Sequence, residues 1–422
     1  MLHSENTVIP AQAIISSPLG KNNKIELLFG TSLYDLKEPQ ISAAADLMVR
    51  DGLRLFSPGA ALIGVPETFF LRNPIEAGVL LASIRDPSDV LQRLLEGGHS
   101  VVAGRLAGAF RRSGRPELAN EILTTMRAAG YDVRESDPFA PQQALAALPA
   151  AAPPIVGRVQ AMWESMRGPV LEVFPQPPGL PEDQEEYLRR VQEIYRSDAY
   201  HSLSIEGYSV TADLIERVRA GNWDPDHHDA DRQSRDALAA RGYWQASQVV
   251  KENVARIIGG ANPGTLVRNS HREWYRELFQ PCVVSGLVGP GALAGYRNGA
   301  VYLRTSRHVP PRWEAVRDAM PALFDLMENE REPGVRAVLG HWLFGYIHPY
   351  PDGNGRMARF LMNAMLASGG YPWTVIRVED RTPYLAALDS ASIDLDIDPF
   401  AAFIAQRVRW SAEQVERQAT RG

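Results

Sequence analysis

The segment 348–359, which reads HPYPDGNGRMAR, constrains the fold of this chain more than any other stretch. In residues 335–347 before it, apolar side chains recur at helical spacing and predict a buried helix. Pro349 and Pro351 prevent that helix from continuing, because proline lacks the backbone N–H that a helix interior requires. A second helix is predicted over residues 355–368. The segment is therefore expected to be a loop between two helices, at the N-terminus of the second one.

The start of a helix attracts anions, and four residues here strengthen that property. Free N–H groups and the helix dipole favour negative charge at this end. Gly353 and Gly355 allow the backbone to turn and to approach an anion closely. Arg356 and Arg359 are three positions apart, so both side chains leave one face of the helix. This set predicts a site for the phosphates of a nucleotide.

Two further side chains of the loop have a role beside a bound nucleotide. Asp352 is suited to hold Mg²⁺, which takes few protein ligands and prefers phosphate oxygens. His348 can accept the proton of an attacking hydroxyl, because histidine titrates close to neutral pH. In the alternative interpretation, the loop is a polar connection with an incidental histidine. The complete ordered set of groups favours the nucleotide site.

This segment resembles the core motif of the Fic family, His-Pro-Phe-x-Asp/Glu-Gly-Asn-Gly-Arg-x-x-Arg, and departs from it only at Tyr350. The resemblance implies a mainly α fold, a Fic-type helical bundle with a small β-hairpin flap. It implies transfer of AMP from ATP to Ser, Thr or Tyr hydroxyls of a target protein, with His348 as the base. It also implies that Asp352 holds Mg²⁺ and that Arg359 holds the γ-phosphate. The expected nucleotide-binding residues are Asp352, Gly353, Asn354, Gly355, Arg356, Arg359 and Tyr384.

Tyr384 is included because its segment, residues 381–385, resembles the family segment whose tyrosine lies against adenine. The ring would give the base a stacking face. Some relatives place an asparagine one or two turns further on, where this chain has Ser392. In the alternative interpretation, Tyr384 belongs to the hydrophobic core.

A second motif, Ser202-x-x-x-Glu206-Gly207, resembles the inhibitory helix of the Fic class that carries it upstream of the core. The resemblance implies a helix near residues 198–207 whose Glu206 pairs with Arg359. That pairing would withdraw the arginine from the γ-phosphate of ATP and keep the enzyme inactive. In the alternative interpretation, the segment is a plain helix end with Gly207 as its C-cap.

Asn298-Gly299, between residues 293–297 and 300–304, predicts a β-hairpin, because this dipeptide favours the tight hairpin turn. The surrounding segment resembles the flap of the Fic family, which implies that it pairs with the extended chain of the target. The alternative is an ordinary surface hairpin. The residues expected to dock the target are Arg297, Val301, Leu303, Thr305 and His308.

Composition divides the chain into three parts. Residues 1–139 predict a separate mixed α/β domain of unknown role, with a strand over 60–71 that Pro66 interrupts. An alanine- and proline-rich linker is predicted at 140–157, and the Fic domain at 158–422. Helices are predicted in the first part at 90–95, 106–110 and 118–126, and in the third at 182–195, 211–220, 232–258, 271–279, 312–327, 380–391 and 399–410.

Two clusters of polar residues outside these motifs have simple interpretations. Arginines gather around the middle helix of the first part and suggest either a face for DNA or a partner, or a solvated helix face; they are Arg105, Arg111, Arg112 and Arg115. The adjacent His227 and His228 have no third ligand at zinc spacing, so we expect a solvated loop there.

Composition also excludes several classes of protein. The net charge of −6 over 422 residues argues against nucleic-acid binding by the whole chain and leaves that role only to residues 1–139. Cys282 is the single cysteine, so no intramolecular disulfide can form, which is typical of a reducing cytosol. No run of 18 apolar residues predicts a membrane span. We therefore expect a cytoplasmic protein that needs ATP and Mg²⁺ and acts on a protein partner.

Three other functions are open from the sequence. Doc-type relatives transfer phosphate instead, but they carry Ala and Lys where this chain has Gly353 and Gly355. Removal of AMP from a modified protein, with Glu206 positioning water, is compatible with the same motifs. A regulator that senses nucleotide and acts through residues 1–139 is compatible as well. The sequence also leaves open self-modification and assembly into homo-oligomers.

Overall fold

The boundary between two structural units falls inside one helix. In the computed structural model the chain divides into Met1–Ser165 and Met166–Gly422, and helix α7 (Pro154–Val173) spans the boundary. The structure describes residues 2–39, 42–50, 52–141, 152–222, 235–304 and 306–419. Most of the segment predicted as a linker lies outside the described residues, as does the loop with His227 and His228. α7 begins within the described end of that predicted linker.

The first unit opens with short strands in two small sheets. β1 (Gln12–Ser17), β3 (Ser32–Lys37) and β2 (Asn23–Glu26) form one sheet in that order. β1 is parallel to β3, whereas β2 is antiparallel to it. β4 (Leu47–Arg50) and β5 (Leu53–Phe56) form a separate antiparallel pair. The mixed α/β character predicted for this part of the chain is confirmed.

Helices occupy the rest of the first unit, and the strand predicted over residues 60–71 is wrong. Ser57 caps the first of these helices by accepting a hydrogen bond from the N–H of Ala60 at 3.3 Å, and Pro58 follows in the first turn. These start signals outweigh the strand-like composition, and Pro66 separates two helices instead of interrupting a strand. The helices predicted at 90–95, 106–110 and 118–126 are confirmed. The elements are α1 (Pro58–Gly64), α2 (Glu67–Arg72), α3 (Pro74–Ser83), α4 (Ser88–Glu96), α5 (Ser100–Arg112) and α6 (Pro116–Ala128).

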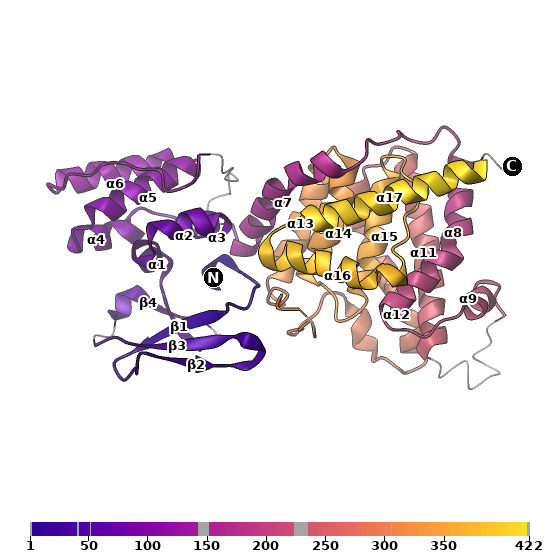
Figure 1. Ribbon diagram of the computed structural model, residues 1–422, viewed down its shortest axis with the longest axis horizontal. Helices are drawn as coiled ribbons and strands as arrows, with labels where there is room; N and C mark the ends of the chain where they lie inside the picture. The colour runs from indigo at the N-terminus through magenta and orange to yellow at the C-terminus, as the bar shows by residue number, and fades with distance from the viewer. Residues whose placement is uncertain are drawn as a thin grey trace. The chain divides into compact units, whose positions relative to one another are not determined.

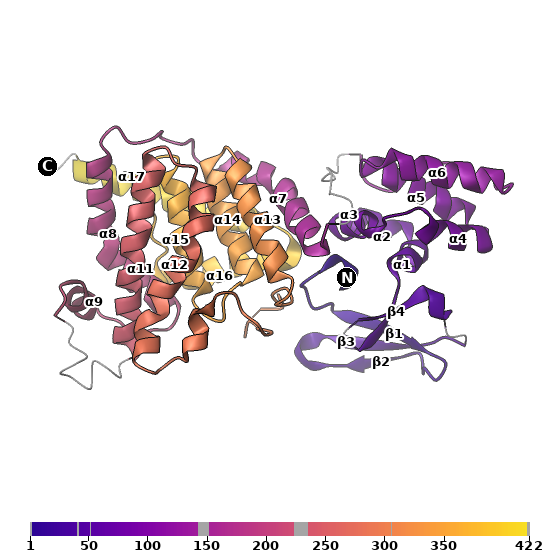
Figure 2. The ribbon, with the colours of Figure 1, turned by 180° about the vertical axis from the view of Figure 1, so that it is seen from behind.

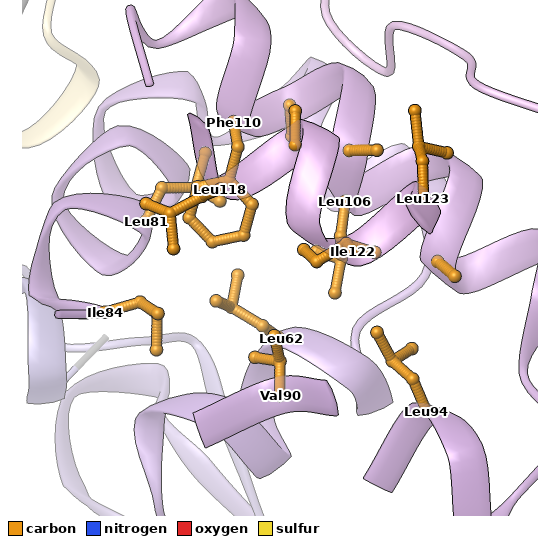
Figure 3. Packing of buried hydrophobic residues seen from close by; sticks show 14 of the residues in the cluster. Leu62, Leu81, Ile84, Val90, Leu94, Leu106, Phe110, Leu118, Ile122 and Leu123 are labelled. Carbon is orange, nitrogen blue, oxygen red and sulfur yellow. The ribbon is translucent and has the colours of Figure 1, made fainter. Parts of the chain in front are cut away.

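The core of the first unit is formed by aliphatic and phenylalanine side chains, and those labelled in Figure 3 point toward one another from α1, α4, α5, α6 and the C-terminal end of α3. Leu106 and Phe110 lie one turn apart on α5 and are fully buried, as are Leu62, Val90 and Ile122. The apolar stripe of each helix therefore faces a common interior.

The arginine cluster of α5 serves this unit internally. Arg105 donates to the carbonyl of Val65 at 2.9 Å, and Arg115 donates to the carbonyls of Leu81 and Ile84 at 3.1 and 2.6 Å. Two more arginines contact the chain after α6: Arg111 pairs with Glu135 at 2.6 Å, and Arg112 donates to the carbonyl of Pro141 at 3.1 Å. Their donors are engaged within the unit, which argues against a face dedicated to DNA.

The second unit is a bundle of helices in which α14 and α15 lie side by side (Figures 1 and 2). Every residue of α14 is buried except Gly345, and every residue of α15 is buried except Gly355. A helix that is covered on all sides belongs to the core of a domain. The helices are α8 (Gln184–Ile205), α9 (Ala212–Arg219), α11 (Arg235–Ile258), α12 (Pro263–Val284), α13 (Val316–Asn329), α14 (Pro333–Ile347), α15 (Asn354–Ala367), α16 (Arg381–Asp389) and α17 (Asp398–Ala419).

The end predicted for the first helix of this unit is wrong for an identifiable reason. α8 continues past Ser197 and Asp198, where the sequence predicted its end. Asp198 is buried and accepts a hydrogen bond from the hydroxyl of Tyr243 at 2.6 Å, so the polar residue is paired inside the bundle. α13 contains Pro321 in its second turn. Within the described residues, no helix combines the length and the apolar character that a membrane crossing requires.

We predict that Phe110→Ala lowers the stability of the first unit by about 3–5 kcal/mol, because it leaves a cavity in a fully buried core. If the two units unfold separately, calorimetry should show a lower melting temperature for one transition and an unchanged temperature for the other. Val101→Ala is the matched control, since Val101 lies on the same helix and is 79% exposed. A single transition that moves as a whole would contradict the division into two units.

Candidate active site

The loop between α14 and α15 is shaped by two residues with left-handed backbones. His348 ends α14 with φ +51, which is uncommon for a residue with a side chain. Gly353 precedes α15 with φ +78, and a Cβ atom there would lie 2.6 Å from the ring of Phe279. Glycine is therefore required at 353 by both the backbone and the space. The predicted helix–loop–helix junction is present, with the N-terminus of α15 after the loop that begins at His348.

Asn354 closes this loop on itself. Its amide donates to the carbonyl of Tyr350 at 2.8 Å, and its side-chain oxygen accepts from the N–H of Tyr350 at 2.9 Å. The Tyr350 ring, in place of the usual phenylalanine, stacks on Tyr275 with centroids 3.8 Å apart. Asn354 was expected to bind the nucleotide, but its side chain is buried and both polar atoms are used by the loop. Its part in the site is to fix the loop's shape.

Arg297 holds the same loop from the other side. Its Nε donates to the carbonyl of His348 at 2.8 Å, and its backbone N–H donates to the carbonyl of Pro349 at 2.8 Å. Further donors of the side chain bind the carbonyls of Gly299, at 3.0 Å, and Pro311. The guanidinium is 3% exposed, and burial lowers its pKa to about 10, so it remains charged at neutral pH. Arg297 is thus a clamp on the loop, and its predicted role in docking the target stays a prediction.

The hairpin predicted around Asn298-Gly299 is also wrong. A 3₁₀ turn, η4 (Pro290–Ala294), leads into an irregular loop, and no strand is found within 293–304. The physical reason is that the backbone N–H of Arg297 binds the motif loop, where a hairpin would require a partner strand. The local turn signal is outweighed by this contact with a distant segment.

The other predicted docking residues lie in different surroundings. His308 is 2% exposed, and its Nε2 lies 2.9 Å from the carbonyl of Tyr346, so it too supports the loop from inside. Val301 and Leu303 are half-buried, which leaves part of each side chain available to a partner. Thr305 lies outside the described residues.

His348 has the electrostatic surroundings of a base. Its Nδ1 lies 3.3 Å from the carbonyl of Gly345, which can only accept a hydrogen bond. Nδ1 therefore carries the hydrogen in this arrangement, and the lone pair is on Nε2. Burial lowers the pKa of His348 from its usual value, and the nearby charge of Arg297 acts in the same direction. The imidazole is consequently neutral at pH 7 and able to accept a proton.

Arg356 is a buried cation with unused donors. It is 1% exposed, and its Cζ lies 5.2 and 5.1 Å from the ring centroids of Tyr208 and Phe279. The nearest carboxylate, of Asp352, is 3.7 Å away. Among the described residues, Nε and Nη2 have no hydrogen-bond acceptor. Such a group is stabilised when a charged acceptor, for example a phosphate oxygen, enters the site.

Arg359, one turn further along α15, is fully engaged by the end of α8. It donates to the hydroxyl of Ser202 at 2.9 Å, to the carbonyl of Ser202 at 3.0 Å, and to Oε1 of Glu206 at 2.7 Å. Burial alone would lower the pKa of Arg359, but the Glu206 carboxylate more than offsets this and the net shift is upward. Burial likewise opposes ionisation of Glu206, yet Arg359 and Arg356 hold its pKa below the usual value. Both groups are therefore charged at neutral pH.

The Glu206 carboxylate also covers the start of α15. A Cβ atom at Gly355 would lie 2.2 Å from its Oε1, so the carboxylate sits directly over this glycine. Gly207 follows with φ +83, and its N–H donates to the carbonyl of Ser204 at 3.0 Å, which ends α8. The segment is thus a helix end capped by Gly207. It also places the carboxylate of Glu206 against the basic groups at the start of α15.

Two residues that the sequence analysis did not assign keep the end of α8 in position. Nε of Arg381 donates to the carbonyl of Ile205 at 2.9 Å. The ring nitrogen Nδ1 of His201 accepts from the N–H of Val378 at 3.2 Å. Both contacts join segments far apart in the sequence, and no local pattern marks them.

Tyr384 is buried, and its predicted contact with adenine stays a prediction. It is 2% exposed, its hydroxyl lies 2.8 Å from Nε2 of His341, and its ring packs against Phe400. Ser392 is buried as well and accepts a hydrogen bond from Trp342 at 3.0 Å. The apolar surroundings of α16 and α17 explain both positions.

Asp352 is the one carboxylate at the tip of the loop, with its side chain 65% exposed. Its Oδ1 accepts from the N–H of Gly353 at 2.6 Å, which leaves Oδ2 directed to solvent and Arg356. Within the described residues, no group of three or more potential ligands could hold a metal ion without help. A single exposed carboxylate does suit Mg²⁺ that arrives with a polyphosphate, because Mg²⁺ keeps several waters and few protein ligands.

The chain is similar to known proteins in this region. Residues 265–366, from α12 to α15, match the model of the Fic/DOC family. The protein adenylyltransferase Fic of Nematostella vectensis is 30% identical over 223 residues, which cover 52% of this chain and 48% of that protein. The protein adenylyltransferase fic-1 of Caenorhabditis briggsae is 31% identical over 229 residues, or 54% and 42% of the two chains. Among solved structures, a fragment of Fic-1 from C. elegans matches with a TM-score of 0.47 and 18% identity, over 78% of this chain and 93% of that one.

This chain therefore carries a Fic/DOC domain, and the resemblance inferred from the motif is confirmed, together with the mainly α fold. The loop at 348–359 lies inside the matched residues, whereas Glu206 and α8 lie outside them. The chain spans less than half the length of the two curated relatives.

We predict that Arg297→Ala destabilises the second unit by about 2–4 kcal/mol even without any partner, because several buried carbonyls lose a charged donor. Urea unfolding of the full chain should give this loss, with Arg304→Ala as the control, since Arg304 is exposed on the same loop. Unchanged stability of Arg297→Ala, with a loss only in target recognition, would restore the docking role and refute the clamp.

Proposed function

We propose that this protein is an adenylyltransferase that transfers AMP from ATP to a hydroxyl of a target protein, and that Glu206 inhibits it. The observation that carries the proposal is the position of the Glu206 carboxylate. It fills the space over Gly355 and binds Arg359, where the helix terminus and two buried arginines favour an anion. The names of the similar proteins from Nematostella vectensis and Caenorhabditis briggsae support the same activity.

The transfer needs one base, and His348 is suited to it. The neutral imidazole takes the proton of a Ser, Thr or Tyr hydroxyl on Nε2. The hydroxyl oxygen then forms a bond to the α-phosphorus, the bond from that phosphorus to the bridging oxygen breaks, and pyrophosphate leaves. The left-handed backbone of His348, held by Arg297, fixes the imidazole at the mouth of the loop. Catalysis then depends mainly on holding the hydroxyl, the base and the α-phosphorus in position, and no covalent intermediate with the protein is needed.

The phosphates would lie at the start of α15. The backbone N–H groups of Asn354 and Gly355 and the unused donors of Arg356 stabilise the charge that develops on the phosphoryl oxygens. Arg359 would hold the γ-phosphate once Glu206 has left it. Asp352 would hold Mg²⁺, which neutralises phosphate charge when it is bound.

The proposed inhibition results from repulsion between the Glu206 carboxylate and the phosphates of ATP. A carboxylate and a triphosphate cannot share one arginine, because like charges at this distance repel strongly outside bulk water. ATP would therefore bind weakly while Glu206 stays in place, and any event that moves the end of α8 would release the enzyme. The contacts of His201 and Arg381 with the chain around α16 indicate which interactions such an event must break.

Phosphate transfer of the Doc type fits this chain poorly. The alanine found in those relatives at position 353 would place its Cβ 2.6 Å from Phe279, on a backbone with φ +78. A lysine at position 355 would collide with Glu206, since even a Cβ atom there comes within 2.2 Å of Oε1. The local packing is built for two glycines.

Removal of AMP from a modified protein is the second candidate, because the Glu206 side chain is 29% exposed and lies next to the anion site. In this position the carboxylate can orient a water molecule for attack on a phosphodiester. Incubation of an AMP-modified target with the wild type and with Glu206→Gly separates the two functions. Loss of label only with the wild type would favour removal.

We predict that His348→Ala abolishes labelling by α-labelled ATP while nucleotide binding is kept, because the phosphate contacts lie elsewhere. In the Glu206→Gly background, kcat/KM should stay level above about pH 6.5 and fall only at lower pH, since burial lowers the pKa of His348 from 6.5. Undiminished labelling by His348→Ala, or a profile centred above pH 7, would contradict the assignment of the base.

We predict that Glu206→Gly converts a nearly silent protein into one that labels itself or a target from a cell lysate. Without nucleotide, the variant should be less stable by about 1–3 kcal/mol, because Arg359 loses a charged acceptor. MgATP should restore that stability by binding the folded state. Autoradiography and thermal melts would measure both effects, with Glu216→Gly, at an exposed ion pair on α9, as the control. Equal labelling by wild type and Glu206→Gly would refute the inhibition.

A further inference from the structure

A pocket of about 600 Å³ opens in the second unit between α12, α13 and the loop after η4. Three arginines line it, together with two asparagines and two aromatic rings, and no aspartate or glutamate is found among its described lining residues. The Tyr296 ring lies in this lining and is 5.6 Å from the Tyr350 ring of the catalytic loop. The pocket is therefore basic and adjacent to the loop that carries His348.

The three arginines differ in how their charge is balanced. Arg268 pairs with Asp325 and Glu328, so its charge is neutralised at the rim. Neither Arg272 nor Arg317 forms an ion pair within the described part of the chain, and each instead lies over an aromatic ring. The uncompensated charge of the pocket thus comes from Arg272 and Arg317.

Arg272 lies over the ring of Tyr296, which a chain of hydrogen bonds holds in place. Nδ1 of His271 lies 3.1 and 2.8 Å from the carbonyls of Val267 and Arg268, so it carries the hydrogen. Nε2 of His271 then accepts from the hydroxyl of Tyr296 at 2.8 Å, and Cζ of Arg272 lies 4.9 Å from the centroid of the Tyr296 ring. Burial lowers the pKa of His271 to about 4, which keeps this neutral tautomer throughout the physiological range. The guanidinium of Arg272 is thereby positioned before any ligand arrives.

Arg317 is fixed in a similar way and keeps spare donors. It donates to the carbonyl of Trp313 at 2.9 Å and to the side chain of Asn298, and its Cζ lies 5.1 Å from the Trp313 ring. A guanidinium has five N–H donors, so donors remain for an incoming acceptor. Two positioned guanidinium groups without a carboxylate form a site for a carboxylate or phosphate group.

The pocket is connected to the catalytic loop through two consecutive residues of the chain. Tyr296, which orients Arg272, immediately precedes Arg297, which holds the backbone of His348 and Pro349. A group bound in the pocket therefore rests on the same rigid segment that positions the base. A volume of about 600 Å³ with Tyr296 and Phe324 in its walls exceeds the needs of a small inorganic anion and suits a side chain with an apolar stem.

We propose that this pocket receives an aspartate or glutamate side chain of the target polypeptide and selects hydroxyls that lie in acidic segments. This inference rests on the proposed transfer of AMP to a protein hydroxyl. The charge of Arg272 and Arg317 supplies the preference, and the contact of Arg297, next to Tyr296 in the pocket wall, with the carbonyl of His348 presents the neighbouring hydroxyl to the base.

Binding can be tested without catalysis. Two fluorescent peptides of identical length and sequence, one with four glutamates and one with glutamines in their places, would be titrated into the full-length protein and followed by anisotropy. We expect the acidic peptide to bind at least about tenfold more tightly, as charge-assisted hydrogen bonds imply. The preference should vanish in Arg272→Gln/Arg317→Gln. It should persist in Arg276→Gln, which removes an exposed charge of α12 outside the pocket.

Three binding results would overturn the proposal. They are equal binding of both peptides by the wild type, a preference that survives in the double variant, and an equal loss in Arg276→Gln, which would indicate general charge attraction. Displacement of the acidic peptide by millimolar inorganic phosphate as readily as by unlabelled peptide would assign the pocket to a free anion instead.

The transfer reaction gives the second readout. In the Glu206→Gly background, a peptide library with one hydroxyl and varied neighbours should be labelled mainly at acidic members, and Arg272→Gln/Arg317→Gln should remove this bias while self-labelling persists. Labelling without acidic bias would overturn the inference and leave the proposed function intact. Acidic peptide binding with no labelling of any protein would overturn the proposed function and leave only the binding preference of the pocket.

Discussion

The arrangement of the site depends on the need of one buried guanidinium for an anion. Arg359 is 3% exposed, and an unpaired charge in such a position is strongly destabilising. The end of α8 meets this need with the hydroxyl and carbonyl of Ser202 and the carboxylate of Glu206. The same contacts join α8 to α15, two helices far apart in the sequence. Because the requirement is for negative charge and not for a particular residue, we propose that the γ-phosphate of ATP replaces the carboxylate without leaving the arginine unpaired.

The loop before α15 separates the groups that give it shape from the groups that act on substrate. Asn354, Arg297 and the Gly353 backbone use their hydrogen bonds or their conformation to hold the loop closed. These contacts stabilise His348 in a left-handed backbone that costs of order 1 kcal/mol or more. Nε2 of His348 and the spare donors of Arg356 are consequently left for chemistry. Substitutions in the first set should act on stability, and those in the second on reaction.

The sequence was most informative where local signals and chemistry coincide. Apolar periodicity and two prolines predicted the junction around His348, and a spacing of three placed Arg356 and Arg359 on one helix. Predictions failed where a distant segment decides the outcome. Residues 293–304 contain a hairpin turn signal, but the carbonyls of the motif loop bind Arg297 and prevent a strand pair. In residues 60–71 the Ser57 cap favours helices over a β-rich composition.

The central claim is that Glu206 competes with the terminal phosphates of ATP for Arg359. The most direct measurement is the affinity of the full-length protein for MgATP and for AMP, by calorimetry, in the wild type and in Glu206→Gly. Competition predicts that the substitution tightens MgATP binding by roughly tenfold or more, as expected for one relieved charge contact, and changes AMP binding little, since AMP lacks the β and γ phosphates. An equal gain for both nucleotides, or no gain for MgATP, would contradict the account.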